Sequence, residues 1–117
     1  MGNVGKSSRD TPEGEGPVVL INTFYPRPGK LDEFLEMQIA EARHLGDAAR
    51  ALGWLGNRIH RARNNQKVVV VTAFTSMAAK EQWARSDLFI EHRRRIEPLL
   101  DRVESDPFDL VFKSGDP

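Results

Sequence analysis

The chain has 117 residues, with 17 Lys and Arg balanced by 17 Asp and Glu, and it contains no cysteine. A chain of this length forms one domain and is marginal unless its surface is shared, so a homodimer is an expectation. The zero net charge gives no global field for nucleic acid or an anionic membrane, and we expect neither as a partner. The missing cysteines exclude disulfides, thiolate metal sites and cysteine nucleophiles, and fit a cytoplasmic location.

Composition divides the chain into three parts. Residues 1–16 are rich in Gly, Ser, Pro and charge and lack an apolar run, so we expect a disordered N-terminal tail. Residues 17–113 form the expected domain, and residues 114–117 a short polar tail. No segment approaches the run of about 18 to 20 apolar residues that a membrane-spanning helix requires.

Periodicity within the domain predicts a strand, a long helix, a hairpin, a broken helix and a last strand. Two prolines end the first strand because they lack the N–H groups that a ladder needs. The turn of the hairpin is Asn64-Asn65. The expected ranges are 18–25 for the first strand, 31–51 for the helix, 54–63 and 67–76 for the hairpin, 77–85 and about 87–96 for the broken helix, and 106–113 for the last strand.

This order of elements indicates an α+β fold of the ferredoxin-like type. Such a fold is a four-stranded antiparallel sheet with helices on one face. The other face would carry Val19, Ile21 and part of the apolar run at 68–71. Two sheets packed face to face would bury that surface, so we expect a homodimer.

An amide interrupts the first strand. Alternation places Leu20, Asn22 and Phe24 on one face and Val19, Ile21 and Thr23 on the other. Asn22 therefore shares its face with two large apolar residues. A buried amide is usually bonded to a nearby backbone group, so Asn22 by itself does not indicate a site.

Trp83 and His92 can contribute to one site only if the second helical region is broken between them. Nine residues of continuous helix would point the two side chains in nearly opposite directions. Ser86 or Asp87 can cap a new helix, on which Phe89 and His92 share the inward stripe. Taken singly, Trp83 suits core packing and His92 a surface position; the break would let them converge.

Together these residues resemble the antibiotic-biosynthesis-monooxygenase-like group of dimeric α+β barrels, and within it the haem-degrading monooxygenases. The resemblance covers about residues 17–113. In the haem-degrading members a strand Asn lies seven positions before the Gly that opens the first helix, as Asn22 lies before Gly29. A Trp precedes a small-residue or Ser-Asp break, as in QWARSDLF, and a His follows it by nine or ten positions, as His92 follows Trp83.

The resemblance implies a homodimeric monooxygenase that degrades haem and releases iron. Haem would be substrate and cofactor together, with molecular oxygen and an external electron donor such as a reductase. His92 would be the axial ligand of the iron, Asn22 would hydrogen-bond to iron-bound oxygen, and Trp83 would press on the porphyrin. Phe89 and Arg93 are further candidates for holding haem, Arg93 together with Arg94 and Arg95 as the nearest basic cluster for the propionates.

Two other functions stay open. The first is a cofactor-independent monooxygenase acting on a phenol or quinol, the other main activity of the wider family; Asn22 and Trp83 would hold substrate and oxygen, and His92 would be dispensable or act as a base. The second is a dimeric module that binds a small-molecule ligand without catalysis. His44 and His60 are expected to face solvent, because nothing at metal-ligand spacing accompanies them.

Overall fold

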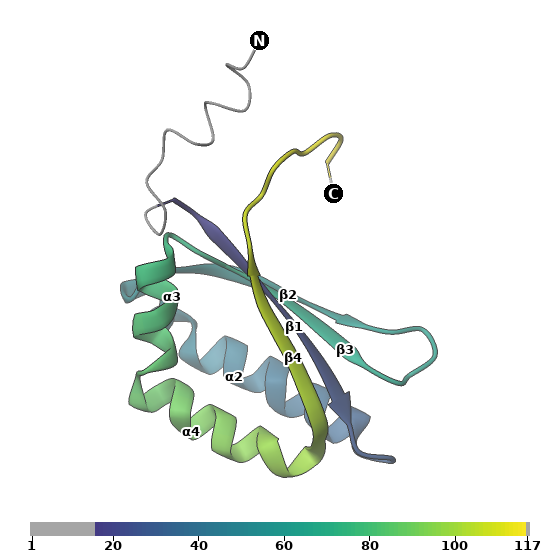
Figure 1. Cartoon of the computed structure of the whole chain (residues 1–117). Helices are drawn as coiled ribbons and strands as arrows, with labels where there is room; N and C mark the ends of the chain where they lie inside the picture. Colours follow the sequence, from purple (N-terminus) through teal and green to yellow (C-terminus); the bar gives the residue numbers. More distant parts are fainter. Residues whose placement is uncertain (1–15, 117) are drawn as a thin grey trace.

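The computed structural model describes residues 16–116, so the tail expected at 1–16 lies almost wholly outside the described residues, as does residue 117. Four antiparallel strands in the order β2-β3-β1-β4 form one sheet, and the helices cover one of its faces (Figure 1). This arrangement confirms the α+β, ferredoxin-like prediction. The elements are β1 (Val18–Pro26), α2 (Leu31–Ala51), β2 (Trp54–Arg61), β3 (Val68–Phe74), α3 (Met77–Ala84), α4 (Asp87–Ile96), the 3₁₀ turn η1 (Glu97–Leu99) and β4 (Leu100–Phe108).

A cluster of buried apolar side chains fixes the helices to the sheet. Phe34 of α2 is fully buried, and its ring centroid lies 4.9 Å from that of Phe24 of β1. Burying an aromatic side chain of this size contributes roughly 1.5–3 kcal/mol. The other buried members of the cluster are Val68, Val70, Ile96, Leu99 and Leu100. In the described part of the chain no helix is long and apolar enough to cross a membrane.

Two serines set the path of the second helical region. Ser76 begins α3 by accepting a hydrogen bond from the Ala79 N–H at 3.0 Å. Ser86 has an extended backbone, accepts from the Phe89 N–H at 3.2 Å and donates to the Trp83 carbonyl at 2.7 Å. Its side chain therefore closes α3 and opens α4, which confirms the predicted break and the Ser86 cap.

The last strand was predicted in the wrong place. The strand at 106–113 was expected from an apolar alternation, but β4 covers Leu100–Phe108, and no helix or strand is formed between 109 and 116. Pairing begins directly after η1, where Leu100 lies opposite Pro26. An edge strand is open along one side, so it tolerates a charged, proline-containing sequence. The side chains of Leu110, Val111 and Phe112 are 68–87% exposed.

Gly53 carries a testable packing constraint. Its φ is +99°, and a Cβ there would lie 2.6 Å from the Ala79 Cβ and 2.7 Å from the Thr75 Oγ1. We expect Gly53→Ala to lower the free energy of unfolding by about 1–3 kcal/mol through strain and overpacking. The matched control is Gly46→Ala in α2, where a Cβ meets no atom within 4 Å, and where we expect a gain of about 0.5–1 kcal/mol. Urea unfolding measures both, and equal effects would contradict the prediction.

Candidate functional site

A cavity of about 440 Å³ lies between the helices and the sheet. Its volume is within the range of about 300–1,000 Å³ that is usual for small-molecule sites. All four strands and the helices α2, α3 and α4 contribute to its wall. The structure brings every predicted site residue to this wall: Asn22, Trp83, Phe89, His92 and Arg93.

Asn22 is unsatisfied. In the sheet it lies opposite Val70 of β3 and Ser105 of β4, and it is half-buried. Its Oδ1 atom is fully buried and has no hydrogen-bond partner among the described residues. An unpaired buried acceptor costs about 1–3 kcal/mol. The interpretation of Asn22 as an amide bonded to nearby backbone therefore does not hold for Oδ1, and the residue lies on the wall of the cavity.

Trp83 and Phe89 form an aromatic wall across the break between α3 and α4. Their ring centroids are 6.1 Å apart and the planes are inclined by 58°. A tilted pair at this distance is a favourable aromatic contact. The Ser86 hydrogen bonds hold the two helix ends that carry these rings. This wall offers an apolar surface to a flat ligand.

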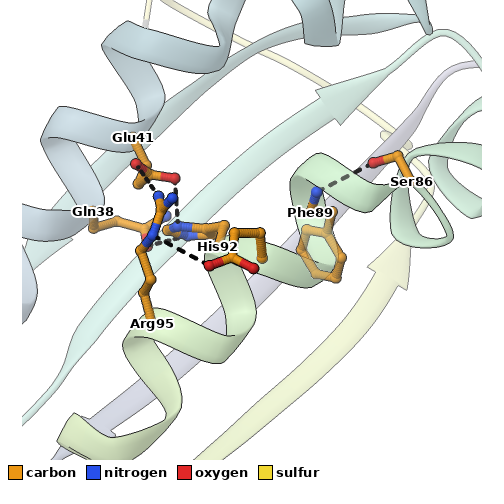
Figure 2. A network of polar contacts seen from close by, with 7 residues as sticks. Gln38, Glu41, Ser86, Phe89, His92 and Arg95 are labelled. Atoms are coloured by element: carbon orange, nitrogen blue, oxygen red, sulfur yellow. Dashed lines mark hydrogen bonds and ion pairs between the residues drawn. The ribbon is translucent and has the colours of Figure 1, made fainter.

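His92 lies in a polar network between α4 and α2 (Figure 2). The residue is only 8% exposed, and its Nε2 atom is 3.0 Å from the Gln38 Oε1. Its Nδ1 atom is 3.4 Å from the Glu41 Oε2, without the geometry of a hydrogen bond. The other oxygen of Glu41 accepts a hydrogen bond from the Arg95 Nη1 at 2.9 Å. Four side chains from two helices are thus tied together beside the cavity.

Burial determines the charge of His92. Loss of solvent lowers the pKa of His92 below its ordinary 6.5, and Arg95 adds to this effect, while the charge and hydrogen-bonding capacity of Glu41 oppose it. His92 is therefore neutral at pH 7 and can accept a proton. A neutral buried imidazole on a small-molecule cavity is suited to general-base chemistry.

The residues present do not fit haem in this arrangement. A histidine that binds iron directs one free ring nitrogen at the metal, while a second group holds the other N–H. Here both ring nitrogens of His92 face side chains of α2. Among the described residues the three candidate arginines are also in ion pairs: Arg93 with Glu97, Arg94 with Glu91, and Arg95 with Glu41 and Glu91. Between residues 16 and 116 no group of three or more His, Cys, Asp or Glu side chains could hold another metal.

Sequence reasoning missed the partners of His92 on α2. Gln38 and Glu41 occupy the helical stripe that continues from Phe34 to Leu45, at spacings of four, three and four residues. Two polar residues in an otherwise apolar stripe are the same signal that Asn22 gives in its strand. His44 and His60 are both exposed, in agreement with the prediction.

The fold and the cavity define a small α+β protein with a cavity of small-molecule size between the sheet and its helices. Residues 17–95 match the family model described as antibiotic biosynthesis monooxygenase, and the chain belongs to that family. The predicted family is thereby confirmed. No curated protein matches the sequence significantly.

Solved structures share the fold at low sequence identity. SnoaB of Streptomyces nogalater, described as a cofactor-independent oxygenase and solved as a point mutant, is 20% identical with a TM-score of 0.73, covering 86% of this chain and 98% of its own. A putative antibiotic biosynthesis monooxygenase from Caulobacter crescentus is 18% identical with a TM-score of 0.75, covering 90% and 99%. Rv0793 of Mycobacterium tuberculosis is 20% identical with a TM-score of 0.66, covering 86% and 100%.

Proposed function

We propose that the protein is a cofactor-independent monooxygenase that oxidises a phenol or quinol with dioxygen. The observation that carries this proposal is a neutral, buried His92 on the same apolar cavity as Asn22 and the Trp83–Phe89 wall. The description of SnoaB as a cofactor-independent oxygenase with the same fold supports it. Haem chemistry is less well supported because Arg93, Arg94 and Arg95, the candidates for holding its propionates, are each paired with a glutamate.

The chemistry requires a base, a place for an aromatic ring and a donor for reduced oxygen. His92 takes the hydroxyl proton, and the resulting anion carries electron density on a ring carbon, which transfers an electron to dioxygen. The new carbon–oxygen bond gives a hydroperoxide, and loss of water leaves a quinone. One oxygen atom stays in the product, the other leaves as water, and the substrate supplies all the electrons. Trp83 and Phe89 hold the ring, and Asn22 offers an amide N–H to the reduced oxygen.

Oxygen uptake tests this function directly. Purified protein is supplied with a panel of polycyclic phenols and quinols in buffer treated with a metal chelator, and oxygen consumption is compared with quinone absorbance. We expect one quinone formed for each oxygen molecule consumed. Absence of protein-dependent uptake across the panel would refute the proposal.

Haem degradation is the second candidate, because the three residues that the resemblance names share one cavity. Iron binding would require a ring nitrogen of His92 to turn away from the side chains of α2, and propionate binding would require the arginines of α4 to leave their acidic partners. Titration with ferric haem separates the two functions. A saturable Soret shift that is lost in His92→Ala would favour haem degradation. The absence of any saturable change would exclude haem as the substrate. Failure of both assays would leave the non-catalytic binding module.

The outer face of the sheet supports a homodimer, which we also propose. The register places Arg58, Val71, Ile21 and Asp106 in one row across the four strands, and the row contains a basic end, an apolar centre and an acidic end. Ile21 and Val71 are half-buried in the single chain. A two-fold axis parallel to the strands would place β2 of one protomer over β4 of its partner, so that opposite charges meet.

We expect Ile21→Asp to convert the dimer to a monomer, because a carboxylate would enter the apolar centre of the interface. Sedimentation velocity measures the change. Leu88→Asp, on an exposed helical position, is the control and should leave the dimer intact. Asp106→Arg should weaken the dimer, and the further change Arg58→Asp should restore it. A wild-type monomer at micromolar concentration would contradict the proposal.

A further inference from the structure

The network around His92 contains two further buried polar side chains, Gln38 and Glu41, which a general base alone does not require. Gln38 and Glu41 lie three residues apart on α2, so both face His92 across the helix contact (Figure 2). Gln38 is 8% exposed, and the Glu41 side chain is 13% exposed. Burying an amide and a carboxylate is unfavourable unless both are paired. Their partners therefore indicate what the two groups do.

Counting hydrogens on His92 leaves one arrangement that satisfies every group. Neutral imidazole has one N–H, and if it were on Nε2 it would donate to Gln38 while the Nδ1 lone pair faced the Glu41 carboxylate at 3.4 Å. The Nδ1 lone pair and the Glu41 carboxylate would then repel each other in a buried environment. With the N–H on Nδ1, Glu41 accepts it after a small ring rotation. Gln38, whose amide is both donor and acceptor, then turns its NH₂ group toward Nε2.

We propose that Glu41 is a positioning residue that holds the His92 proton on Nδ1 and so makes Nε2 the proton-accepting atom, with the Gln38 amide as the group that a substrate hydroxyl replaces. This inference rests on the proposed function. Arg95 fixes Glu41 by its 2.9 Å hydrogen bond, and Glu91 lies 3.7 Å from the Arg95 Nε. Glu91, Arg95 and Glu41 thus form one chain of alternating charge that ends at the neutral His92 on the cavity wall.

The proton balance is complete without another reagent. The substrate O–H bond breaks, the proton binds Nε2, and the electron pair stays on the substrate oxygen. The imidazolium that forms donates from Nδ1 to the Glu41 carboxylate, which stabilises the charged intermediate more than the neutral ground state. His92 later returns the proton to the oxygen that leaves as water.

Few other charges face His92. From α2 only Glu41 does so, and from its own helix Arg95 contributes. The cavity residues on β1, β3 and β4 are uncharged, and Lys80 of α3, Arg93 and Glu97 are the remaining charged residues of the cavity wall. Loss of the Glu41 charge is therefore expected to act on His92 and on its ion-pair partner Arg95.

Glu41→Gln tests the inference because it keeps the shape of the side chain and removes its charge. We expect kcat to fall about tenfold or more with KM within about threefold. The ¹⁵N shifts of His92 should move from the Nδ1–H toward the Nε2–H tautomer. Glu41→Asp should partly restore both, and Glu36→Gln, on the exposed side of α2, should change neither.

The outcomes separate this inference from the proposed function. If Glu41→Gln leaves kcat and the tautomer unchanged while wild type oxidises phenols, the positioning role is refuted and the function stands. If wild type consumes no oxygen, the function fails, and the role of Glu41 is judged by the ¹⁵N shifts alone. A wild-type His92 with its proton on Nε2 would overturn the inference in either case.

Discussion

His92→Gln is expected to lower kcat/KM for phenol oxidation by about 10²- to 10⁴-fold, the usual contribution of a positioned base. Glutamine can still hydrogen-bond across the α2–α4 contact, but it has no basic nitrogen. The exposed His44 of α2 gives the matched control, since His44→Gln removes an imidazole without touching the cavity. Oxygen uptake under saturating and limiting substrate measures both variants. A His92→Gln enzyme within a few-fold of wild type would exclude His92 as the base.

The pH dependence of the wild type follows from the environment of the same ring. Burial lowers the pKa of His92, so the neutral form persists below pH 6.5. The value of kcat/KM, whose pH dependence reports the free enzyme, should therefore stay constant as pH falls through 6.5 and decline only at lower pH. The free energy of unfolding also falls with pH. His92 binds a proton at about pH 6.5 in the unfolded chain but only at lower pH in the folded chain, so its contribution to stability is present above pH 6.5 and is lost as the pH falls below it. His92→Gln should remove that part of the acid sensitivity.

The fold could be predicted because its local signals agree with one another. The stripe of α2, the alternation of β1 and the Ser86 cap each indicate the elements that form. The position of β4 could not be found in this way. The apolar alternation from Phe108 to Phe112 is a stronger strand pattern than the charged sequence of β4, but the pairing with β1 follows from where η1 ends. Pairing between strands that are distant in the sequence cannot be read from the local alternation of apolar residues.

The candidate site, like the fold, was partly predictable from local sequence signals. Asn22, Trp83 and His92 could be assembled because the helix break makes their convergence geometrically possible. The stripe of α2 could have placed Gln38 and Glu41 on the inward face, but only the packing of α4 against α2 shows that they meet His92. The fit of haem depends on that same contact. Residue spacing alone therefore supports the iron-ligand role of His92, and the side-chain partners oppose it.

Asn22 joins stability to function, and the two are expected to change in opposite directions on mutation. Its buried, unpaired Oδ1 lies in a strand face shared with Leu20 and Phe24. An acceptor left without a partner costs about 1–3 kcal/mol, which the fold would avoid by placing an apolar residue there. Unsatisfied polar groups are common at functional sites, so the unpaired amide marks Asn22 as a candidate for contact with a ligand.

Asn22→Leu is therefore expected to raise the free energy of unfolding by about 1 kcal/mol, because a side chain of similar size replaces an unsatisfied one. The same change should lower kcat by about 10²-fold or more, since no amide N–H remains for the reduced oxygen. Asn22→Ala is the matched comparison: it loses the amide equally but leaves a void, so activity should fall without the gain in stability. Urea unfolding and oxygen uptake measure the pair. A fully active Asn22→Leu protein would show that the amide has no role in the reaction, whereas a more stable and inactive one is the expected result.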